Sequence, residues 1–286
     1  MKEILKIKKP PASHWVGDGF PVRSLFAFDD AEFPISPFLL LDYAGPAEFP
    51  PSSTAKGVRL HPHRGFETVT LVYRGEVEHK DTVGNQGKIG PGDVQWMTAG
   101  SGLLHEEMHS AEFTKNGGTL QMIQLWVNLP AKDKMTAPQY QEILKAQIPS
   151  LPLENGAGSL RVIAGSYQDQ PGPAKTFTPV NVWEARLQSG ASADIEFPQG
   201  FTAMLVVLEG SVQVNDAETL EEAGMAAFDS KGERIRLAAK EESMVLLLSG
   251  QALNEPVAHY GPFVMNTRAE LLKAIEDYEK GRMGLA

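Results

Sequence analysis

The segment HPHRGFETVTLVY, residues 61–73, joins a closely spaced pair of histidines to a β-strand pattern. From Glu67 to Tyr73 it is rich in the β-branched and aromatic residues that favour strands. Successive side chains of a strand point to opposite faces, so His61 and His63 point in the same direction. The segment therefore predicts a strand that presents two imidazoles on one face.

A second pair of this kind occurs at His105 and Glu107. If the two strands face each other, three imidazoles and one carboxylate meet at one point. Nitrogen and oxygen donors in this mixture suit a first-row transition metal, whereas calcium and magnesium prefer oxygen shells. We therefore expect one mononuclear metal site with the ligands His61, His63, His105 and Glu107. The alternative is two unrelated polar strand ends.

Composition sets the outer limits of function. The chain has 286 residues and a formal net charge of -10, which argues against non-specific binding of nucleic acid. It contains no cysteine, so disulfides and thiolate ligands are excluded. The sequence has no apolar stretch of membrane-spanning length and no signal-peptide pattern at its start, so we expect a cytoplasmic protein without a membrane anchor.

Short strands separated by Gly, Pro, Asn and Asp clusters recur along the chain and predict a β-sandwich or barrel. Residues 2–9 are expected to add an edge strand, and residues 135–146 a short helix. Residues 148–158 are rich in Pro, Gly and Asn and are interpreted as a domain linker. Thr267 and Glu270 fit a capping box, which predicts a C-terminal helix.

The second half of the chain repeats the first. A shift of 135 residues places Gly65 on Gly200 and aligns the strand and turn pattern that follows. In this alignment His61 falls on Glu196, and no histidine occurs between His109 and His259. The repeat predicts two similar β units, of which only the first holds a metal.

Several motifs together resemble the pirin family, whose members are two-domain proteins of the cupin superfamily. They span nearly the whole chain: HWVGDGFPVRSLF (14–26), HPHRGFETV (61–69), GKIGPGDVQWMTAGSGLLHEEM (87–108), QMIQLWVNLP (121–130) and EPVAHYGPFVMNT (255–267). The resemblance implies an all-β fold of two cupin-type jelly-roll barrels packed face to face, with a C-terminal helix. We expect a metal-binding barrel over residues 1–147 and a barrel without metal over residues 159–286.

The metal pattern of the family, two histidines in HPH and then H-x-E, falls on His61, His63, His105 and Glu107. Glu67 occupies the carboxylate position that many other cupins use as a ligand, and we interpret it as a supporting or structural residue. His14 is interpreted as a packed residue of the N-terminal arm. The expected metal is Fe(2+), although Ni, Co, Mn, Cu and Zn accept the same ligands.

Four protein ligands leave two positions of an octahedral metal open, which suits a chelating substrate or substrate and dioxygen together. Some pirin-like proteins are similar in activity to quercetin 2,3-dioxygenase, which opens the central ring of a flavonol and releases carbon monoxide. The resemblance therefore implies an oxidoreductase that uses a flavonol-like substrate and dioxygen. Glu107 is then the candidate general base for the flavonol hydroxyl, and Phe66 is a candidate for the cavity wall.

The resemblance also covers a non-enzymatic alternative, an iron-containing regulator that binds transcription factors or a metabolic enzyme. A sugar-binding or isomerase cupin is a third, weaker alternative. An enzyme needs a substrate-sized opening at the metal, whereas a redox switch needs a small one. We expect a monomer, because the internal repeat already supplies a pseudo-dimer within one chain, and no direct contact with nucleic acid or membrane.

Overall fold

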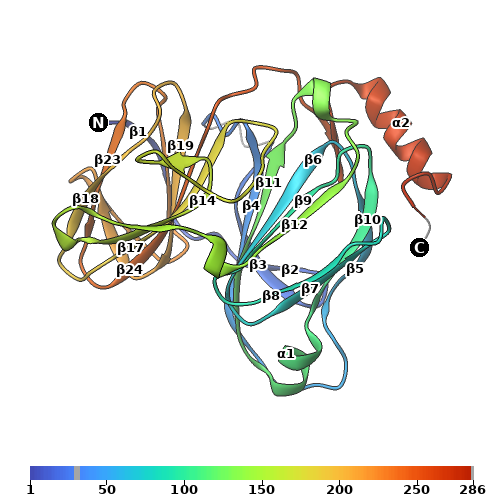
Figure 1. Cartoon of the computed structure of the whole chain (residues 1–286), viewed down its shortest axis with the longest axis horizontal. Coiled ribbons are helices and arrows are strands. Elements are labelled where there is room, and N and C mark those ends of the chain that lie inside the picture. The colour runs from blue at the N-terminus through green and yellow to red at the C-terminus, as the bar shows by residue number, and fades with distance from the viewer. Residues whose placement is uncertain (29–32, 285–286) are drawn as a thin grey trace. The chain divides into compact units, whose positions relative to one another are not determined.

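A computed structural model describes residues 1–28 and 33–284 and confirms an all-β protein with a C-terminal helix (Figure 1). The chain divides into two compact units. The N-terminal barrel comprises Ser13–Phe26, Phe38–Lys145 and Leu253–Ala286, and the C-terminal barrel comprises Met1–Ala12, Ala27–Pro37 and Ala146–Ala252. None of the described helices is both long enough and apolar enough to span a bilayer.

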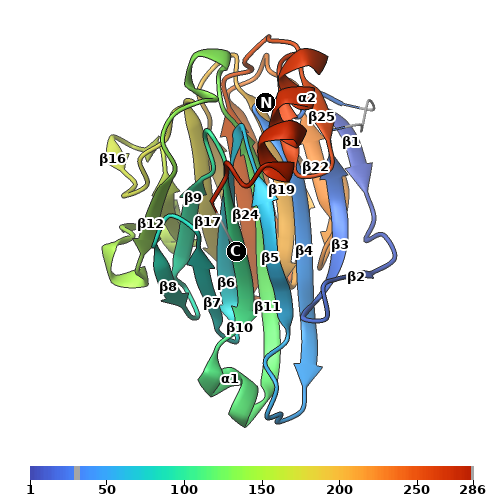
Figure 2. The same ribbon diagram turned by 90° about the vertical axis from the view of Figure 1, so that its right-hand side faces the viewer.

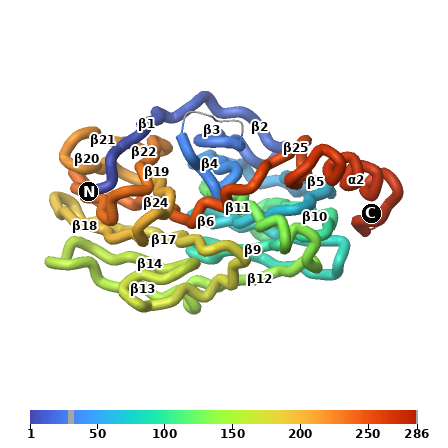
Figure 3. The backbone as a smooth tube through the Cα atoms, turned by 90° about the horizontal axis from the view of Figure 1, so that it is seen from above, coloured from blue at the N-terminus to red at the C-terminus, as the bar shows by residue number. Residues whose placement is uncertain are grey.

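Each end of the chain belongs to the barrel formed mainly by the other half. The observed division of the chain differs from the expected domain boundaries of 1–147 and 159–286. One reason is that β1 (Ile4–Lys8) pairs with β22 (Met225–Phe228) of the C-terminal barrel. Figure 3 shows β1, in dark blue, running alongside β22. The expected edge strand at residues 2–9 is thus confirmed.

The N-terminal barrel is made of two antiparallel sheets. The seven-stranded sheet has the order β12-β9-β6-β11-β4-β3-β2, and the four-stranded sheet has the order β5-β10-β7-β8. Their bounds are β2 His14–Val16, β3 Phe20–Ala27, β4 Phe38–Phe49, β5 Gly57–His63, β6 Phe66–Arg74, β7 Val77–Asp81, β8 Gln86–Ile89, β9 Val94–Thr98, β10 Leu103–His109, β11 Gly118–Asn128 and β12 Gln139–Ile143. The barrel also holds α1 (Ala111–Asn116), the hairpin β25 (Ala258–Tyr260) and β26 (Phe263–Met265), and α2 (Arg268–Glu279).

The C-terminal barrel has sheets of the same two sizes, in the orders β1-β22-β19-β24-β17-β14-β13 and β18-β23-β20-β21. The remaining bounds are β13 Ser150–Pro152, β14 Gly158–Ala164, β17 Val180–Leu187, β18 Ser192–Glu196, β19 Thr202–Glu209, β20 Ser211–Val214, β21 Glu218–Glu221, β23 Arg234–Ala239 and β24 Ser243–Gly250. A small hairpin joins β15 (Ser166–Tyr167) and β16 (Gln170–Pro171). The matching strand orders confirm the internal repeat.

Two expectations for the segment between the repeats were wrong. Residues 135–146 do not form a helix: Gln139–Ile143 is strand β12, flanked by the 3-10 turns Ala131–Asp133 and Lys145–Gln147. β12 pairs with β9, so its backbone completes the edge of the sheet, and this tertiary pairing overrides local helix propensity. Nor is 148–158 a free linker, because β13 pairs with β14 there.

The C-terminal helix α2 begins where the sequence predicts, with Thr267 and Glu270 forming a capping box. Asp277 fixes this helix to the N-terminal barrel: its carboxylate lies 3.0 Å from the Arg64 guanidinium, at the end of β5. Lys273 and Arg282 also bind this carboxylate, at 2.7 and 2.8 Å. Hydrogen bonding from Lys273, and then from Arg64 and Arg282, lowers the pKa of Asp277 below its ordinary value.

We expect Asp277→Asn to lower the melting temperature at neutral pH, because three cations lose their counter-ion. Because the pKa of Asp277 is lower in the folded than in the unfolded protein, its ionised form stabilises the fold at pH values above the unfolded pKa of about 4. This stabilisation is lost as the pH falls through the folded pKa. The difference in melting temperature between wild type and Asp277→Asn should therefore become smaller in acid. Thermal unfolding followed by circular dichroism over a pH series measures it. Glu279→Gln on the same helix is the control, and a pH-independent gap for Asp277→Asn would contradict the assignment.

Candidate metal centre

Strands β5 and β10 bring the predicted histidines together. They are neighbouring strands of one sheet (Figure 2) and run antiparallel. Their register places His105 opposite His61. Ring nitrogens of His61, His63 and His105 all lie within 4.8 Å of one another. Within residues 1–28 and 33–284, this is the one cluster of His, Cys, Asp and Glu side chains with the spacing of metal ligands.

Each imidazole has its Nδ1 atom engaged, which leaves Nε2 for the cluster. Nδ1 of His61 lies 2.8 Å from the carbonyl oxygen of Arg59, and Nδ1 of His63 lies 3.4 Å from that of Pro262. A carbonyl oxygen only accepts, so each Nδ1 carries a proton and Nε2 is the nitrogen left to bind a metal. This is the tautomer that a metal needs.

His105 is the most enclosed of the three. Its side chain is fully buried, and its Nε2 atom has no hydrogen-bond partner. Burial, followed by the neighbouring imidazoles, lowers the pKa of both His63 and His105 well below the ordinary value. Both rings are therefore neutral at neutral pH, and an unpaired buried nitrogen beside two others fits a bound metal ion.

Glu107 lies on the same strand as His105 but is not part of the three-histidine cluster. Its Oε1 accepts hydrogen bonds from Thr70 Oγ1 at 2.8 Å and from Gln95 Nε2 at 3.1 Å, and its Oε2 lies 3.4 Å from Gln124 Nε2. The carboxylate is thus held from three sides at the border of the cluster. Its role as fourth ligand stays a prediction.

The other candidates lie outside this cluster. Glu67 accepts a hydrogen bond from Thr98 at 2.7 Å, and burial raises the pKa of Glu67 to about 7. His14 is exposed on β2 and is not packed as expected. Phe66 is buried with its ring centroid 4.3 Å from that of Trp126, and it is not among the residues that line the cavity described next.

A cavity of about 240 Å³ opens beside His61, His63 and Glu107. Its walls come from β2, β3, β4, β5, β10 and β11 and from the turn between β25 and β26. They are mostly apolar, with Asp42 as a second carboxylate; the other lining residues are Val16, Phe20, Val22, Val58, Met122, Gln124, Trp126 and Pro262. Sequence reasoning missed Asp42, Gln124 and Trp126. Each lies in a predicted strand, but no spacing in the sequence links these strands to the histidines.

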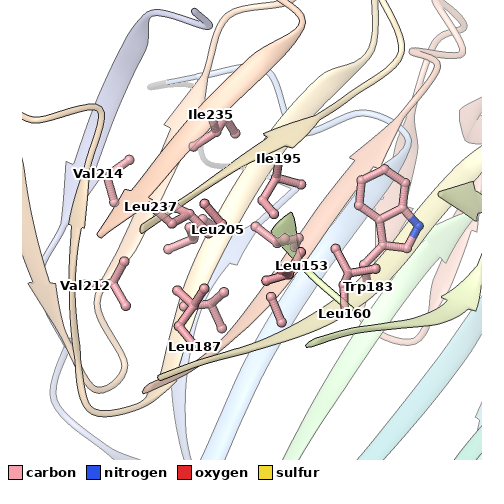
Figure 4. Packing of buried hydrophobic residues seen from close by; sticks show 14 of the residues in the cluster. Leu153, Leu160, Trp183, Leu187, Ile195, Leu205, Val212, Val214, Ile235 and Leu237 are labelled. Atoms are coloured by element: carbon pink, nitrogen blue, oxygen red, sulfur yellow. The ribbon is translucent and has the colours of Figure 1, made fainter. Parts of the chain in front are cut away.

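The C-terminal barrel shows what the same positions become without a metal site. There the register of β18 and β23 pairs Ile195 with Ile235, in the places of His61 and His105. This corrects the alignment of His61 with Glu196 by one residue. Phe197 and Leu237 correspond likewise to His63 and Glu107, and all four side chains belong to one apolar core. Figure 4 shows Ile195, Ile235 and Leu237 within this core.

Comparisons with known proteins agree with this geometry. The family model "Pirin" matches residues 19–127, and "Pirin C-terminal cupin domain" matches residues 182–284. A Pseudomonas aeruginosa protein named "Putative quercetin 2,3-dioxygenase" is 55% identical over 99% of this chain and 98% of its own length. The crystal structure of a quercetin 2,3-dioxygenase from Acinetobacter baumannii has a TM-score of 0.96 at 51% identity, covering 99% of both chains.

A more distant structure, a bacterial pirin from Escherichia coli in complex with nickel(II), has a TM-score of 0.64 at 21% identity. It covers 86% of this chain and 100% of that one, and at this identity it supports the fold alone.

We expect His61→Ala and His105→Ala to lose most bound metal while keeping the fold, because each removes one of three clustered nitrogens. Metal content after loading and dialysis, measured by mass spectrometry of the metal, tests this. Glu196→Ala, an exposed residue of the C-terminal barrel, is the control and should bind as wild type does. A fully metalated His61→Ala variant would refute the site.

Proposed function

Since the chain belongs to the pirin family, we propose that it is a metal-dependent dioxygenase that opens the central ring of a flavonol with release of carbon monoxide. One observation carries the proposal: an apolar cavity has two of the three clustered histidines in its wall. A site that only stores or senses a metal does not need such a cavity. The quercetin 2,3-dioxygenase names of relatives support the same reaction class.

His61, His63 and His105 would hold the metal, with Glu107 as the proposed fourth ligand. A first-row ion, for which we propose Fe(2+), would supply Lewis acidity toward the substrate hydroxyl and redox chemistry toward dioxygen. The chain contributes neutral imidazoles, because burial keeps His63 and His105 unprotonated. It also contributes the Glu107 carboxyl group, which accepts hydrogen bonds from the side chains of Thr70 and Gln95.

Glu107 is also the proposed base for the flavonol hydroxyl. Both of its oxygens are oriented by Thr70, Gln95 and Gln124, so the carboxylate keeps one position as substrate enters. It lines the cavity beside His61 and His63, within the wall that a ligand must contact. A base held in place in this way loses little entropy when the proton moves.

The apolar part of the cavity wall suits a flat aromatic ligand. Phe20, Met122 and Trp126 supply apolar surface that excludes water. Asp42 is the polar exception: its Oδ1 accepts a hydrogen bond from Ser24 at 2.5 Å, while burial raises its pKa. We propose that Asp42 accepts a hydrogen bond from a phenolic hydroxyl of the substrate.

The reaction is tested by loading the protein with Fe(II) without oxygen, adding quercetin and air, and following loss of flavonol absorbance together with carbon monoxide. We expect metal-dependent turnover that His61→Ala abolishes. Glu107→Gln should lower kcat by about 100-fold or more, the usual contribution of a general base, and its metal content separates loss of the base from loss of a ligand. Absence of turnover with every first-row metal would favour the regulatory alternative.

We expect Asp42→Asn to raise KM for quercetin about tenfold while leaving kcat close to wild type, because one charge-assisted hydrogen bond to bound substrate is weakened. Steady-state kinetics measure the two parameters separately. Asp194→Asn, in the C-terminal barrel, is the matched control. An unchanged KM would show that Asp42 does not contact the substrate.

A further inference from the structure

Three buried side chains, Asp81, His79 and His105, are connected in this order by hydrogen bonds. Nε2 of His79 lies 3.2 Å from Oδ2 of Asp81, and Nδ1 of His79 lies 3.3 Å from Nδ1 of His105. The side chains of His79 and Asp81 have no exposed surface. At the end of this hydrogen-bonded chain, Nε2 of His105 has no partner and lies in the three-histidine cluster.

The direction of these hydrogen bonds is fixed by Asp81. Its carboxylate accepts from the backbone N–H of Val83 at 3.1 Å, and from the backbone and side chain of Asn85, each at 2.8 Å. Hydrogen bonds from His79 and Asn85 lower the pKa of Asp81 despite its burial, so it is an acceptor. Nε2 of His79 must therefore carry a proton.

The remaining protons then follow. An imidazole that carries its single proton on Nε2 has a lone pair on Nδ1, and in His79 this lone pair lies 3.3 Å from Nδ1 of His105, where it accepts the Nδ1–H of His105. His105 is thereby held in the tautomer whose Nε2 is free to bind a metal. In the other tautomer, two lone pairs would face each other between the rings, and a buried N–H would point into the cluster without an acceptor.

His79 itself is held firmly. Its ring stacks on that of Tyr140, with centroids 4.7 Å apart and planes at 20°. The register of β7 and β10 places His79 opposite Glu107 and Asp81 opposite His105. The stack restricts His79 to one ring plane, and a half-turn within this plane would break the contact between Nε2 and Asp81.

His105 differs from the other two histidines in the nature of this support. His61 and His63 contact backbone carbonyl oxygens, which are present whatever the side chain. The corresponding partner of His105 is a side chain, so its tautomer depends on the identity of one residue.

The C-terminal barrel supplies an independent comparison. Its strand β20 pairs with β23 as β7 pairs with β10, and Val214 stands opposite Leu237 where His79 stands opposite Glu107. Val214 is buried in the same apolar core as the residues that replace the three histidines (Figure 4). The position of His79 is thus polar only in the barrel that has the cluster.

We propose that His79, oriented by Asp81, is a positioning residue of the metal centre: it sets the tautomer and the ring orientation of His105. The inference rests on the proposed metal site, but it is independent of the flavonol reaction. It also assigns a role to a histidine outside the predicted ligand set.

The test compares two substitutions of the same residue. His79→Phe keeps a flat ring against Tyr140 but removes the acceptor, and the affinity for nickel(II), used as the probe, should fall about 10–100-fold, as is usual for partners of ligating histidines. In His79→Asn the amide oxygen takes the place of Nδ1, so its affinity should stay closer to wild type than to the Phe variant. His109→Phe is the control, because His109 is a buried histidine of β10 that binds the carbonyl of Gly19.

A second measurement needs no metal. Long-range nitrogen–proton NMR spectra of the metal-free protein, with labelled histidine, report which ring nitrogen carries the proton. Wild type should show the Nδ1–H tautomer for His105 and the Nε2–H tautomer for His79, and the Phe variant should show a mixture for His105. This readout stands even if a variant is too unstable for binding studies.

The outcomes separate the inference from its premise. No nickel binding by wild type would overturn the metal centre itself. Normal binding by His79→Phe, binding by His79→Asn as weak as that of the Phe variant, or an Nε2–H tautomer of His105 in wild type would overturn the role of His79 alone.

Discussion

The site depends on the register between β5 and β10. Antiparallel pairing sets His105 opposite His61, and the two-residue period of a strand adds His63 on the same side. A slip of one residue would turn these side chains to the other face of the sheet. Gly65, which follows β5, supports this arrangement: it has a positive φ of 87°, and a Cβ atom there would lie 2.0 Å from the carbonyl oxygen of Val264.

The two barrels show alternative solutions to the same packing problem. In the C-terminal barrel, aliphatic and aromatic side chains fill the interior and gain free energy from burial. In the N-terminal barrel the corresponding positions hold imidazoles and a carboxylate, whose desolvation is costly unless each polar atom finds a partner. Thr70, Gln95, Gln124 and His79 supply several of these partners, so polar side chains surround the unpaired Nε2 of His105 and the Glu107 carboxyl group.

Much of this was accessible from the sequence, where the signal was local. Alternation within strands predicted the histidine cluster, and the capping box predicted α2. What failed depended on pairing between distant segments: nothing in Gln139–Ile143 reveals the edge of β9, and nothing in residues 4–8 reveals β22. Asp42 and Trp126 line the cavity because the order of strands in the sheet places β4 and β11 beside the histidines, and this order cannot be read from either strand alone. His79 is different, because its signal was local: Val77, His79 and Asp81 alternate along one strand and so share a face. This pattern in the sequence could have indicated His79 as a buried polar residue.

Residues 1–12 belong to the C-terminal barrel and residues 253–286 to the N-terminal barrel, which affects the order in which the two barrels can be completed during synthesis. The carbonyl oxygens of Pro262 and Val264, which contact His63 and the buried ammonium of Lys134, lie 199 and 130 residues further along the chain than the residues they contact. Conversely, the strand β1, which pairs with β22 of the C-terminal barrel, comes before every strand of the N-terminal barrel. A nascent chain therefore cannot finish its metal centre until the ribosome has passed the whole of β13–β24 and released the hairpin β25–β26.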